Sequence, residues 1–441
     1  MRVGGGTNAL AIDPTSKGLM WMASESKVLG ILVGGGPAPG INGVISAATI
    51  EARNNGFEVI GFMEGFKHLM AGRSDQSRPL DIDTVSRIHF QGGSILKTAR
   101  ANPTKSPEDM KRVIESLRRA KVNCLVTIGG DDTAFSMSKL GAAAPNEFQL
   151  VHVPKTIDND LPLPPSIPTF GFETARHVGV GVLKNLMADA QTAPRWYIVV
   201  AMGRKAGHLA LGIGKAASAP LTVIAEEWQG KPVTFKGICD IVEGTIIKRR
   251  FLGRDHGVVI LAEGLAEFMS NEEREAAFGS DDTERDEHGH IRIDDIEFGP
   301  AIRRELRRRF KARGINETMV TKNLGYELRC ADPIPFDCEY TRNLGYGAIR
   351  YLLQGGSGAI VTFQGGLLHP LKIESLLDAQ SGRPRVRYVD VTSESYEVAR
   401  QYMIRLEKRD FEDDSRLEKL AQAGKLTVAE FKEKFQYLAA E

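Results

Sequence analysis

Residues 28–62 read VLGILVGGGPAPGINGVISAATIEARNNGFEVIGF. The apolar run Val28 to Val33 predicts a strand, and it ends in the glycine-rich stretch Gly34 to Gly40. Ile41 to Asn54 then predicts a helix, and Phe57 to Phe62 a second strand. The order strand, glycine loop, helix, strand is typical of a parallel sheet flanked by helices.

The same alternation continues along the chain. Further strands are expected at 122–128, 149–153, 196–201, 221–225 and 258–261, with helices that begin at Ser106-Pro107 and cover about 174–190 and 300–313. The expected fold class is therefore α/β, with two Rossmann-like three-layer domains and mostly parallel sheets. Residues 1–27 predict a flexible extension, and 280–290 a polar loop.

Composition excludes several classes of function. The 441 residues are 42% hydrophobic and 26% charged, with a net charge of +1, so no global field favours nucleic acid or an anionic membrane. The arginines of 300–313 indicate a solvated helix face. No apolar run approaches the roughly 18 residues of a membrane span. The four cysteines form no CxxC pair, which favours a reducing, cytoplasmic setting.

Three polar loops follow predicted strands. Gly34 to Gly40 could be only a tight turn, but backbone N–H groups that no side chain shields also suit a phosphate. Asp131-Asp132 follows the strand 122–128; such a pair is often a helix cap, although adjacent carboxylates also favour a divalent metal, and Mg²⁺ fits best. Because ligands bind at the carboxyl ends of parallel strands, we expect all three loops to face one crevice.

The third loop follows the strand 149–153 and reads Pro154-Lys155-Thr156-Ile157-Asp158-Asn159-Asp160. Asp158 in a crevice could accept the proton of an attacking hydroxyl. Lys155 could be an ordinary surface lysine, or it could offset charge on a transferred phosphoryl group.

Three arginines, Arg195, Arg204 and Arg329, lie at or beside predicted strand ends. A single such arginine is more often a surface ion pair. Together they would clamp a sugar phosphate, because the guanidinium fork suits phosphate oxygens.

From about Val28 to the C-terminus the chain resembles the phosphofructokinase family. The resemblance rests on GGGPAPGIN, GGDDT, PKTIDND, MGR, AEG and LGYELR, which occur in this order. It implies that Gly35 contacts the phosphoryl donor, Asp131 holds Mg²⁺ and Asp158 is the proton acceptor. It also implies that fructose 6-phosphate is bound by Thr156, Ile157, Asp158, Met202, Gly203, Arg204, Glu263, Tyr326, Glu327, Leu328 and Arg329.

The resemblance also bears on assembly. Arg195 matches a family arginine that reaches the active site of a neighbouring subunit, which implies a homodimer or homotetramer with shared sites. A second neighbour-supplied arginine, expected near Val320, is missing, with Lys322 as a substitute. Ser46 and Ile50 replace effector-site arginines, so we expect weak or no nucleotide regulation.

Two residues bear on the donor. ATP-dependent members typically carry glycine where this chain has Asp132, and bacterial ATP-dependent members carry glycine at the position of Lys155. A carboxylate at Asp132 would repel the α-phosphate of ATP, whereas pyrophosphate ends before reaching it. The expected activity is therefore reversible phosphorylation of fructose 6-phosphate by magnesium pyrophosphate, with Asp158, Lys155 and Asp132 as catalytic residues and Gly35 and Lys155 at the donor.

The expected domains are a donor domain, 28–168 plus 328–385, and a fructose 6-phosphate domain, 169–327 plus 386–441. The nearest alternative is an ATP-dependent or mixed-donor 6-phosphofructokinase. Others are a nicotinamide or lipid kinase with a similar GGDGT-like loop, and a sugar-phosphate-binding regulatory subunit. The intact Asp131, Asp158 and Arg204 speak against the regulatory subunit, and the MGR and LGY segments against the other kinases.

Overall fold

The computed structural model describes residues 27–164, 166–279, 296–378, 380 and 384–439. The chain forms two compact units. Unit 1 comprises residues up to Thr156, Leu161–Thr174 and Arg329–Arg385, and unit 2 comprises Ile157–Asp160, Ala175–Leu328 and Val386–Glu441. The expected extension 1–27, apart from Lys27, and the expected polar loop 280–290 lie outside the described residues.

Unit 1 is built on one mixed sheet of order β11-β10-β5-β4-β1-β2-β3. Its inner strands are parallel, while β3 runs antiparallel to β2 and β11 antiparallel to β10. The strands are β1 (Val28–Val33), β2 (Glu58–Phe62), β3 (Ser77–Pro79), β4 (Val122–Gly129), β5 (Gln149–Pro154), β10 (Ala359–Gln364) and β11 (Leu367–Lys372). Because β5, β4 and β1 are neighbours, the unit 1 residues that directly follow them, Gly34, Gly130 and Lys155, lie at one edge of the sheet.

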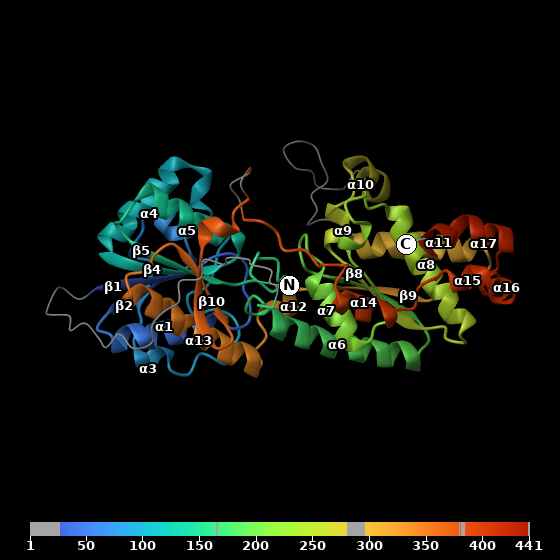
Figure 1. Cartoon of the computed structure of the whole chain (residues 1–441), viewed down its shortest axis with the longest axis horizontal. Helices are drawn as coiled ribbons and strands as arrows, with labels where there is room; N and C mark the ends of the chain where they lie inside the picture. The colour runs from blue at the N-terminus through green and yellow to red at the C-terminus, as the bar shows by residue number, and fades with distance from the viewer. Residues whose placement is uncertain (1–26, 165, 280–295, 379, 381–383, 440–441) are drawn as a thin grey trace, which may run out of the picture. The chain divides into compact units, whose positions relative to one another are not determined.

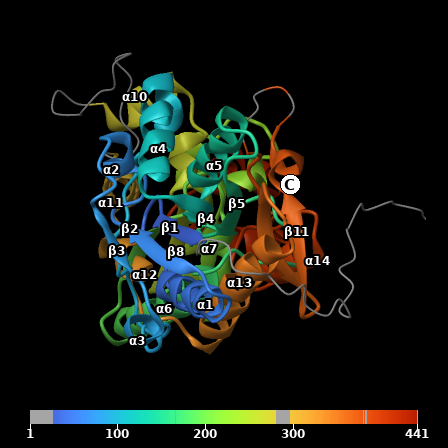
Figure 2. The same cartoon turned by 90° about the vertical axis from the view of Figure 1, so that its left-hand side faces the viewer.

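Helices cover both faces of this sheet (Figure 1; Figure 2). α1 (Ile41–Asn54) and α13 (Pro335–Leu353) pack on one face, and α4 (Pro107–Arg119) and α5 (Asp131–Ala143) on the other. A Cβ atom at Gly43 of α1 would lie 2.2 Å from Oγ1 of Thr341 in α13, so glycine allows this close approach. The short elements are α2 (Lys67–Met70), α3 (Ile82–Val85), η1 (Pro103–Lys105) and η4 (Ile373–Leu376).

Unit 2 has a smaller, wholly parallel sheet of order β7-β8-β6-β9. Its strands are β6 (Trp196–Ala201), β7 (Leu221–Val223), β8 (Gly257–Ala262) and β9 (Met319–Leu324). Residues of β6 and β8 are almost all buried, as expected for parallel strands covered on both faces.

The sheet of unit 2 is also covered by helices on both faces. α6 (Phe172–Thr192) and α7 (His208–Ala217) lie together, with Gly179 against Ile213, while α8 (Phe235–Phe251) and α11 (Phe298–Ala312) cover the other face (Figure 1). The remaining elements are η2 (Ala225–Trp228), α9 (Gly264–Glu267), α10 (Asn271–Phe278), α12 (Tyr326–Arg329), α14 (Glu394–Gln401), α15 (Arg409–Glu412), α16 (Asp414–Ala423), α17 (Val428–Phe435) and η5 (Gln436–Ala439).

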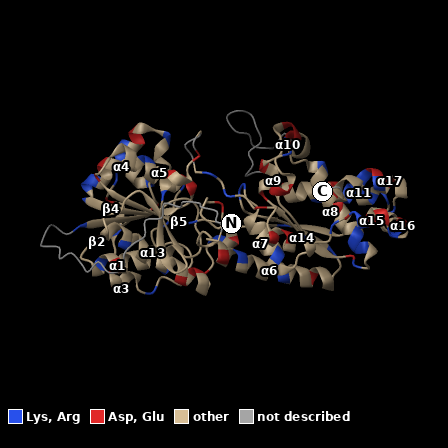
Figure 3. Cartoon of the chain, viewed as in Figure 1, with Lys and Arg blue, Asp and Glu red and all other residues tan. Residues whose placement is uncertain are grey.

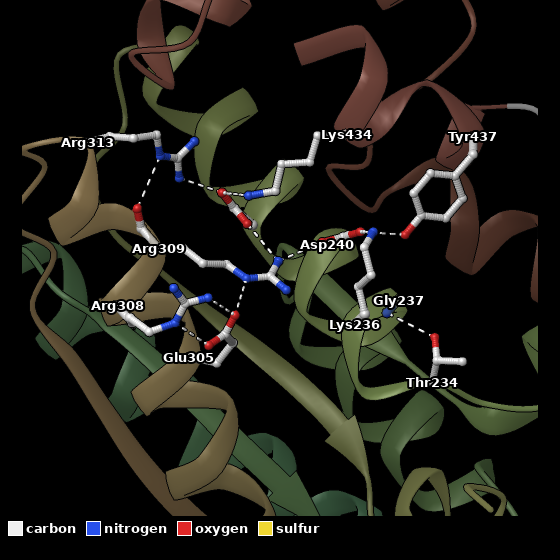
Figure 4. A network of polar contacts seen from close by, with 11 residues as sticks. Thr234, Lys236, Gly237, Asp240, Glu305, Arg308, Arg309, Arg313, Lys434 and Tyr437 are labelled. Carbon is white, nitrogen blue, oxygen red and sulfur yellow. Dashed lines mark hydrogen bonds and ion pairs between the residues drawn. The ribbon is translucent and has the colours of Figure 1, made fainter. Parts of the chain in front are cut away.

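A buried ionic network ties the C-terminal helices to α8 (Figure 4). Asp240 and Glu243 of α8 are fully buried, and Arg309 of α11 donates to both, at 2.6 and 2.9 Å. Lys434 donates to Glu243 at 2.7 Å, and the Tyr437 hydroxyl donates to Asp240 at 2.7 Å. Removing one partner of such a network would leave a buried charge without a counter-charge, which is strongly destabilising. The C-terminal segment is therefore an integral part of unit 2.

These observations confirm the expected α/β class and mostly parallel sheets. Strands 28–33 and 196–201 and helix 41–54 coincide with their predicted bounds. Ser106 is the N-cap of α4 and Pro107 stands in its first turn, as predicted, although the Ser106 side chain makes no capping hydrogen bond. One local expectation was wrong: the strand predicted over 221–225 ends at Val223, because η2 begins at Ala225.

Charges of both signs occur on the helices of each unit (Figure 3). On α11, Arg308 pairs with Glu305 at 2.8 Å, and Arg309 turns inward to Asp240, so this arginine-rich helix is only partly the solvated face that its sequence suggests. Within the described part of the chain, no helix is long and apolar enough to cross a membrane.

Candidate active site in two clusters

The glycine loop after β1 is held by backbone hydrogen bonds and packs closely against Thr133. Gly34 N donates to Ile128 O at 2.9 Å, and Gly35 N to Ala99 O at 3.0 Å. A Cβ atom at Gly34 or at Gly129 would lie 2.3 Å from Oγ1 of Thr133. Thr133, the last residue of GGDDT, therefore packs between two loops that only glycine allows to approach.

Two cations lie against this loop within unit 1. The buried Lys155 donates from Nζ to the carbonyl of Gly36, and a Cβ atom at Gly35 would lie 3.4 Å from that Nζ. A Cβ atom at Gly36 would lie 3.5 Å from the guanidinium carbon of Arg329. Gly35 has a φ of 81°, in the left-handed region that favours glycine. The loop thus presents bare backbone beside positive charge, as an anion site requires.

Asp131 and Asp132 are the first two residues of α5. Gly130 is the N-cap and provides no side-chain cap, and the two carboxylates stand at the positive end of the helix dipole. Asp131 is half-buried and Asp132 is exposed. Among the described residues no group of three or more His, Cys, Asp or Glu side chains could hold a metal. A site of one or two carboxylates completed by phosphate and water oxygens is nevertheless the usual one for Mg²⁺, so these residues fit that ion.

We call Gly34–Gly36, Asp131, Asp132, Lys155 and Arg329 the loop cluster. Sequence reasoning missed one residue beneath it, the fully buried His152 of β5. Its Nε2 lies 2.9 Å from the carbonyl of Gly129, and its Nδ1 lies 2.8 Å from the hydroxyl of Thr127. Burial lowers the pKa of His152 to about 3, so the ring is neutral. It supports the loop by its hydrogen bonds to Thr127 and Gly129.

Asp158 and the residues around it belong to unit 2. Ile157 and Asp158 are both buried, at 4% and 7% exposed. Asn159 has a φ of 57°, a left-handed conformation that asparagine tolerates better than most residues. Thr156, the last residue before this segment, belongs to unit 1, where its carbonyl accepts from Thr169 Oγ1 at 2.7 Å.

The loop Met202–Arg204 follows β6 and is fixed by Glu263. One oxygen of this carboxylate accepts from Gly203 N at 3.2 Å and from Arg204 N at 3.1 Å. Arg204 has a φ of 50°, and its side chain is 52% exposed, 3.8 Å from the Asp160 carboxylate. In this geometry Glu263 shapes the loop, and the Arg204 guanidinium is accessible to an anionic ligand.

The segment Tyr326–Leu328 follows β9 in unit 2. Tyr326 is 78% exposed, while the Leu328 side chain is fully buried and could meet a ligand only through its backbone. Glu327 accepts from Lys322 at 2.8 Å and from Gly325 N at 3.1 Å. Lys322, expected as a substitute for a missing arginine, thus pairs with Glu327. A Cβ atom at Gly325 would lie 2.7 Å from Met202, so the two loops pack together.

We call Asp158, Met202–Arg204, Glu263 and Tyr326–Leu328 the carboxylate cluster. Arg195, just before β6, donates from Nε to Ala193 O at 2.9 Å and lies 3.5 Å from Asp189. Its expected reach into a neighbouring subunit remains a prediction. Ser46, the residue in place of an effector-site arginine, is buried inside α1 and cannot meet an effector there.

Comparison with known proteins identifies the class. Residues 28–352 match the sequence family described as Phosphofructokinase, which is most of the chain. This protein therefore belongs to the phosphofructokinase family.

Among its relatives, the pyrophosphate--fructose 6-phosphate 1-phosphotransferase of Naegleria fowleri is 56% identical over 417 residues, which span 93% of this chain and 95% of the relative. The protein of the same name from Thermotoga maritima is 53% identical over 410 residues, 92% of this chain and 97% of the relative. The solved structure of a pyrophosphate-dependent phosphofructokinase from Nitrosospira multiformis superposes with a TM-score of 0.64, covering 90% of this chain and 91% of that one, at 16% identity. The last likeness concerns the fold alone.

Proposed function

We propose that this protein transfers a phosphoryl group from pyrophosphate to C1 of fructose 6-phosphate, giving fructose 1,6-bisphosphate and phosphate. The observation that carries the proposal is the identity of 56% and 53%, over nearly the whole chain, to two relatives named for this reaction. Asp131, Asp158 and Arg204, three residues that the family resemblance assigns to it, are present.

The loop cluster suits the donor. Pyrophosphate would lie along Gly35 and Gly36, with Lys155 offsetting its charge. Arg329, which the family resemblance assigns to fructose 6-phosphate, lies against Gly36 and would bind that sugar phosphate beside the donor. Asp131 would hold Mg²⁺, which when bound neutralises charge on the phosphoryl oxygens. The Lys155 contact with the Gly36 carbonyl supports this assignment, because it keeps the ammonium group at the loop.

Asp132 favours pyrophosphate over ATP. It is exposed on the first turn of α5, where its negative charge would oppose the α-phosphate of a bound nucleotide. An ATP-dependent or mixed-donor kinase remains the second candidate only if this carboxylate turns out not to select the donor.

The carboxylate cluster suits the acceptor. Asp158 would take the proton from the 1-hydroxyl, Arg204 would bind the 6-phosphate, and the Met202–Gly203 and Tyr326–Glu327 segments would enclose the sugar. Lys155 and Asp158 are only three residues apart in the chain, so their Cα atoms lie within about 11 Å of each other. The base and the cation that offsets phosphoryl charge are thereby linked by the backbone itself.

Unit 1 would then be the donor domain and unit 2 the fructose 6-phosphate domain. We also propose a homodimer or homotetramer in which Arg195 serves a neighbouring site. A cytoplasmic location is consistent with the free thiols of Cys124, Cys239, Cys330 and Cys338. Because pyrophosphate and a sugar phosphate have comparable transfer potential, we expect the reaction to run in both directions.

The test is a direct measurement of both directions with Mg²⁺ present. Fructose 6-phosphate plus pyrophosphate should yield fructose 1,6-bisphosphate, and fructose 1,6-bisphosphate plus phosphate should yield pyrophosphate. Absence of product in both directions from folded protein would refute the proposed reaction. If only one of the two starting mixtures gave product, reversibility would be refuted.

A further inference from the structure

A single arginine far along the chain holds the backbone that follows Asp158. Arg387 lies just after the last passage of the chain into unit 2, 228 residues beyond Asn159. Its Nε donates to the Asn159 carbonyl at 3.0 Å, and its Nη2 donates to the Asn159 side-chain oxygen. Its backbone N donates to the Asp160 carbonyl at 2.8 Å. Two consecutive carbonyls after Asp158 are therefore bonded to one residue.

The turn that Arg387 holds is a strained one. Asn159 adopts a left-handed φ of 57°, and such conformations persist where the surroundings over-determine them, often at functional sites. A charged donor on both the carbonyl and the side chain of Asn159 is the kind of restraint that this conformation needs. The Asp160 carboxylate lies 3.8 Å from the Arg204 guanidinium, so holding the Asn159–Asp160 turn also restrains the partner of Arg204.

Arg387 is itself held at its backbone. The ring of His208, at the start of α7, lies with Nε2 3.0 Å from the Arg387 carbonyl. Burial, with a contribution from the Arg387 charge, lowers the pKa of His208 to about 4, so the neutral ring donates this bond from Nε2. Glu226 accepts from Val389 N at 3.1 Å and from Gly207 N at 2.8 Å. The backbone around Arg387 is thus fixed to Gly207 and His208, which follow the Met202–Arg204 loop.

We propose that Arg387 is a positioning residue for the phosphoryl transfer: by fixing the Asn159–Asp160 turn it sets the direction of the Asp158 carboxylate. The proposal rests on the proposed role of Asp158 as the base. Arg387 touches neither donor nor acceptor in this account, so it acts on kcat through Asp158 rather than on substrate affinity.

The experiment compares Arg387→Gln and Arg387→Lys with Arg385→Gln as a matched control. Arg385 lies two residues away on the surface, where its guanidinium donates to the Ser375 carbonyl. Misplacing a reacting group by about 1 Å costs on the order of 10²-fold in rate, so Arg387→Gln should lower kcat by about 10²-fold with little change in KM for fructose 6-phosphate. Arg387→Lys should recover part of kcat, because an ammonium group can still donate to Asn159.

A second readout does not depend on activity. In Arg387→Gln the backbone amides of residues 157–161 should exchange hydrogen faster than in wild type, while the melting temperature stays close to that of Arg385→Gln. If exchange and kcat both match the control, Arg387 does not position the turn. If KM, kcat and melting temperature all worsen together and lysine gives no rescue, its role is merely structural. If wild type makes no product while exchange responds as expected, the proposed reaction fails and the turn restraint stands.

Discussion

The two clusters are built in different ways. In the loop cluster, close approach depends on missing side chains: Gly34 and Gly129 leave room for Thr133, and bare backbone meets Lys155. In and next to the carboxylate cluster, two non-glycine residues, Arg204 and Asn159, adopt left-handed backbone conformations and are held there by Glu263 and Arg387 respectively. Both clusters join segments that are distant in the chain, but in the first the absence of side chains allows the close approach. In the second, polar side chains hold the backbone.

The largest expected effect comes from the carboxylate cluster. Asp158→Asn removes the proposed base without changing side-chain size, so kcat should fall by about 10²- to 10⁴-fold, while KM for fructose 6-phosphate changes little. Steady-state kinetics would show this, with Asp255→Asn on the exposed loop after α8 as the matched control. Wild-type kcat in Asp158→Asn would remove Asp158 from the mechanism.

The loop cluster should respond sterically. In Gly34→Ala the new Cβ would lie 2.3 Å from the Thr133 hydroxyl, which should cost about 1–3 kcal/mol of unfolding free energy. Adding Thr133→Ala removes that hydroxyl and should restore part of the loss, as measured by chemical denaturation. Gly181→Ala is the control, because a Cβ there meets nothing within 4 Å and it lies inside α6. It should be neutral or stabilising. Additive losses for Gly34 and Thr133 would contradict the packing argument.

A smaller effect concerns the buried ring beneath the loop cluster. The pKa of His152 is lowered to about 3 in the folded state from an ordinary value near 6.5, so only the unfolded chain gains its proton as pH falls below 6.5. The stabilisation that comes from keeping His152 neutral is therefore complete above pH 6.5 and is lost progressively down to about pH 3. At pH 5 the free energy of unfolding has fallen by about 2 kcal/mol on this account. His152→Gln should show a decline between pH 7 and 5 that is shallower by this amount. An unchanged pH slope would mean that His152 is not held neutral.

Sequence reasoning recovered the two clusters unequally. The glycine loop, Asp131, Asp132 and Lys155 could be placed together because they follow strands that are neighbours in a parallel sheet. The loops around Asp158 and Arg204 were found through motifs, but their restraints were not. Arg387, His208 and Glu226 look like ordinary polar residues in the sequence, and only the fold brings them within bonding distance.

Burial was the other quantity that the sequence did not give. Nothing in the run Gln149 to Pro154 distinguishes His152 as a neutral core residue, because a histidine in a strand can equally face solvent. Similarly, Leu328 within LGYELR matched a sugar-binding motif, yet its side chain lies in the core. Motif membership predicts the segment, while the strand and helix geometry decides which side chains face outward.

The choice of donor can be measured as kcat/KM for pyrophosphate and for ATP, each with Mg²⁺ and fructose 6-phosphate, in wild type and in Asp132→Gly. We expect turnover with pyrophosphate and not with ATP in wild type. In the variant, kcat/KM for ATP should rise at least about tenfold, equivalent to about 1.4 kcal/mol of relieved repulsion. A wild-type preference for ATP, or a variant as inactive with ATP as wild type, would contradict the role assigned to Asp132.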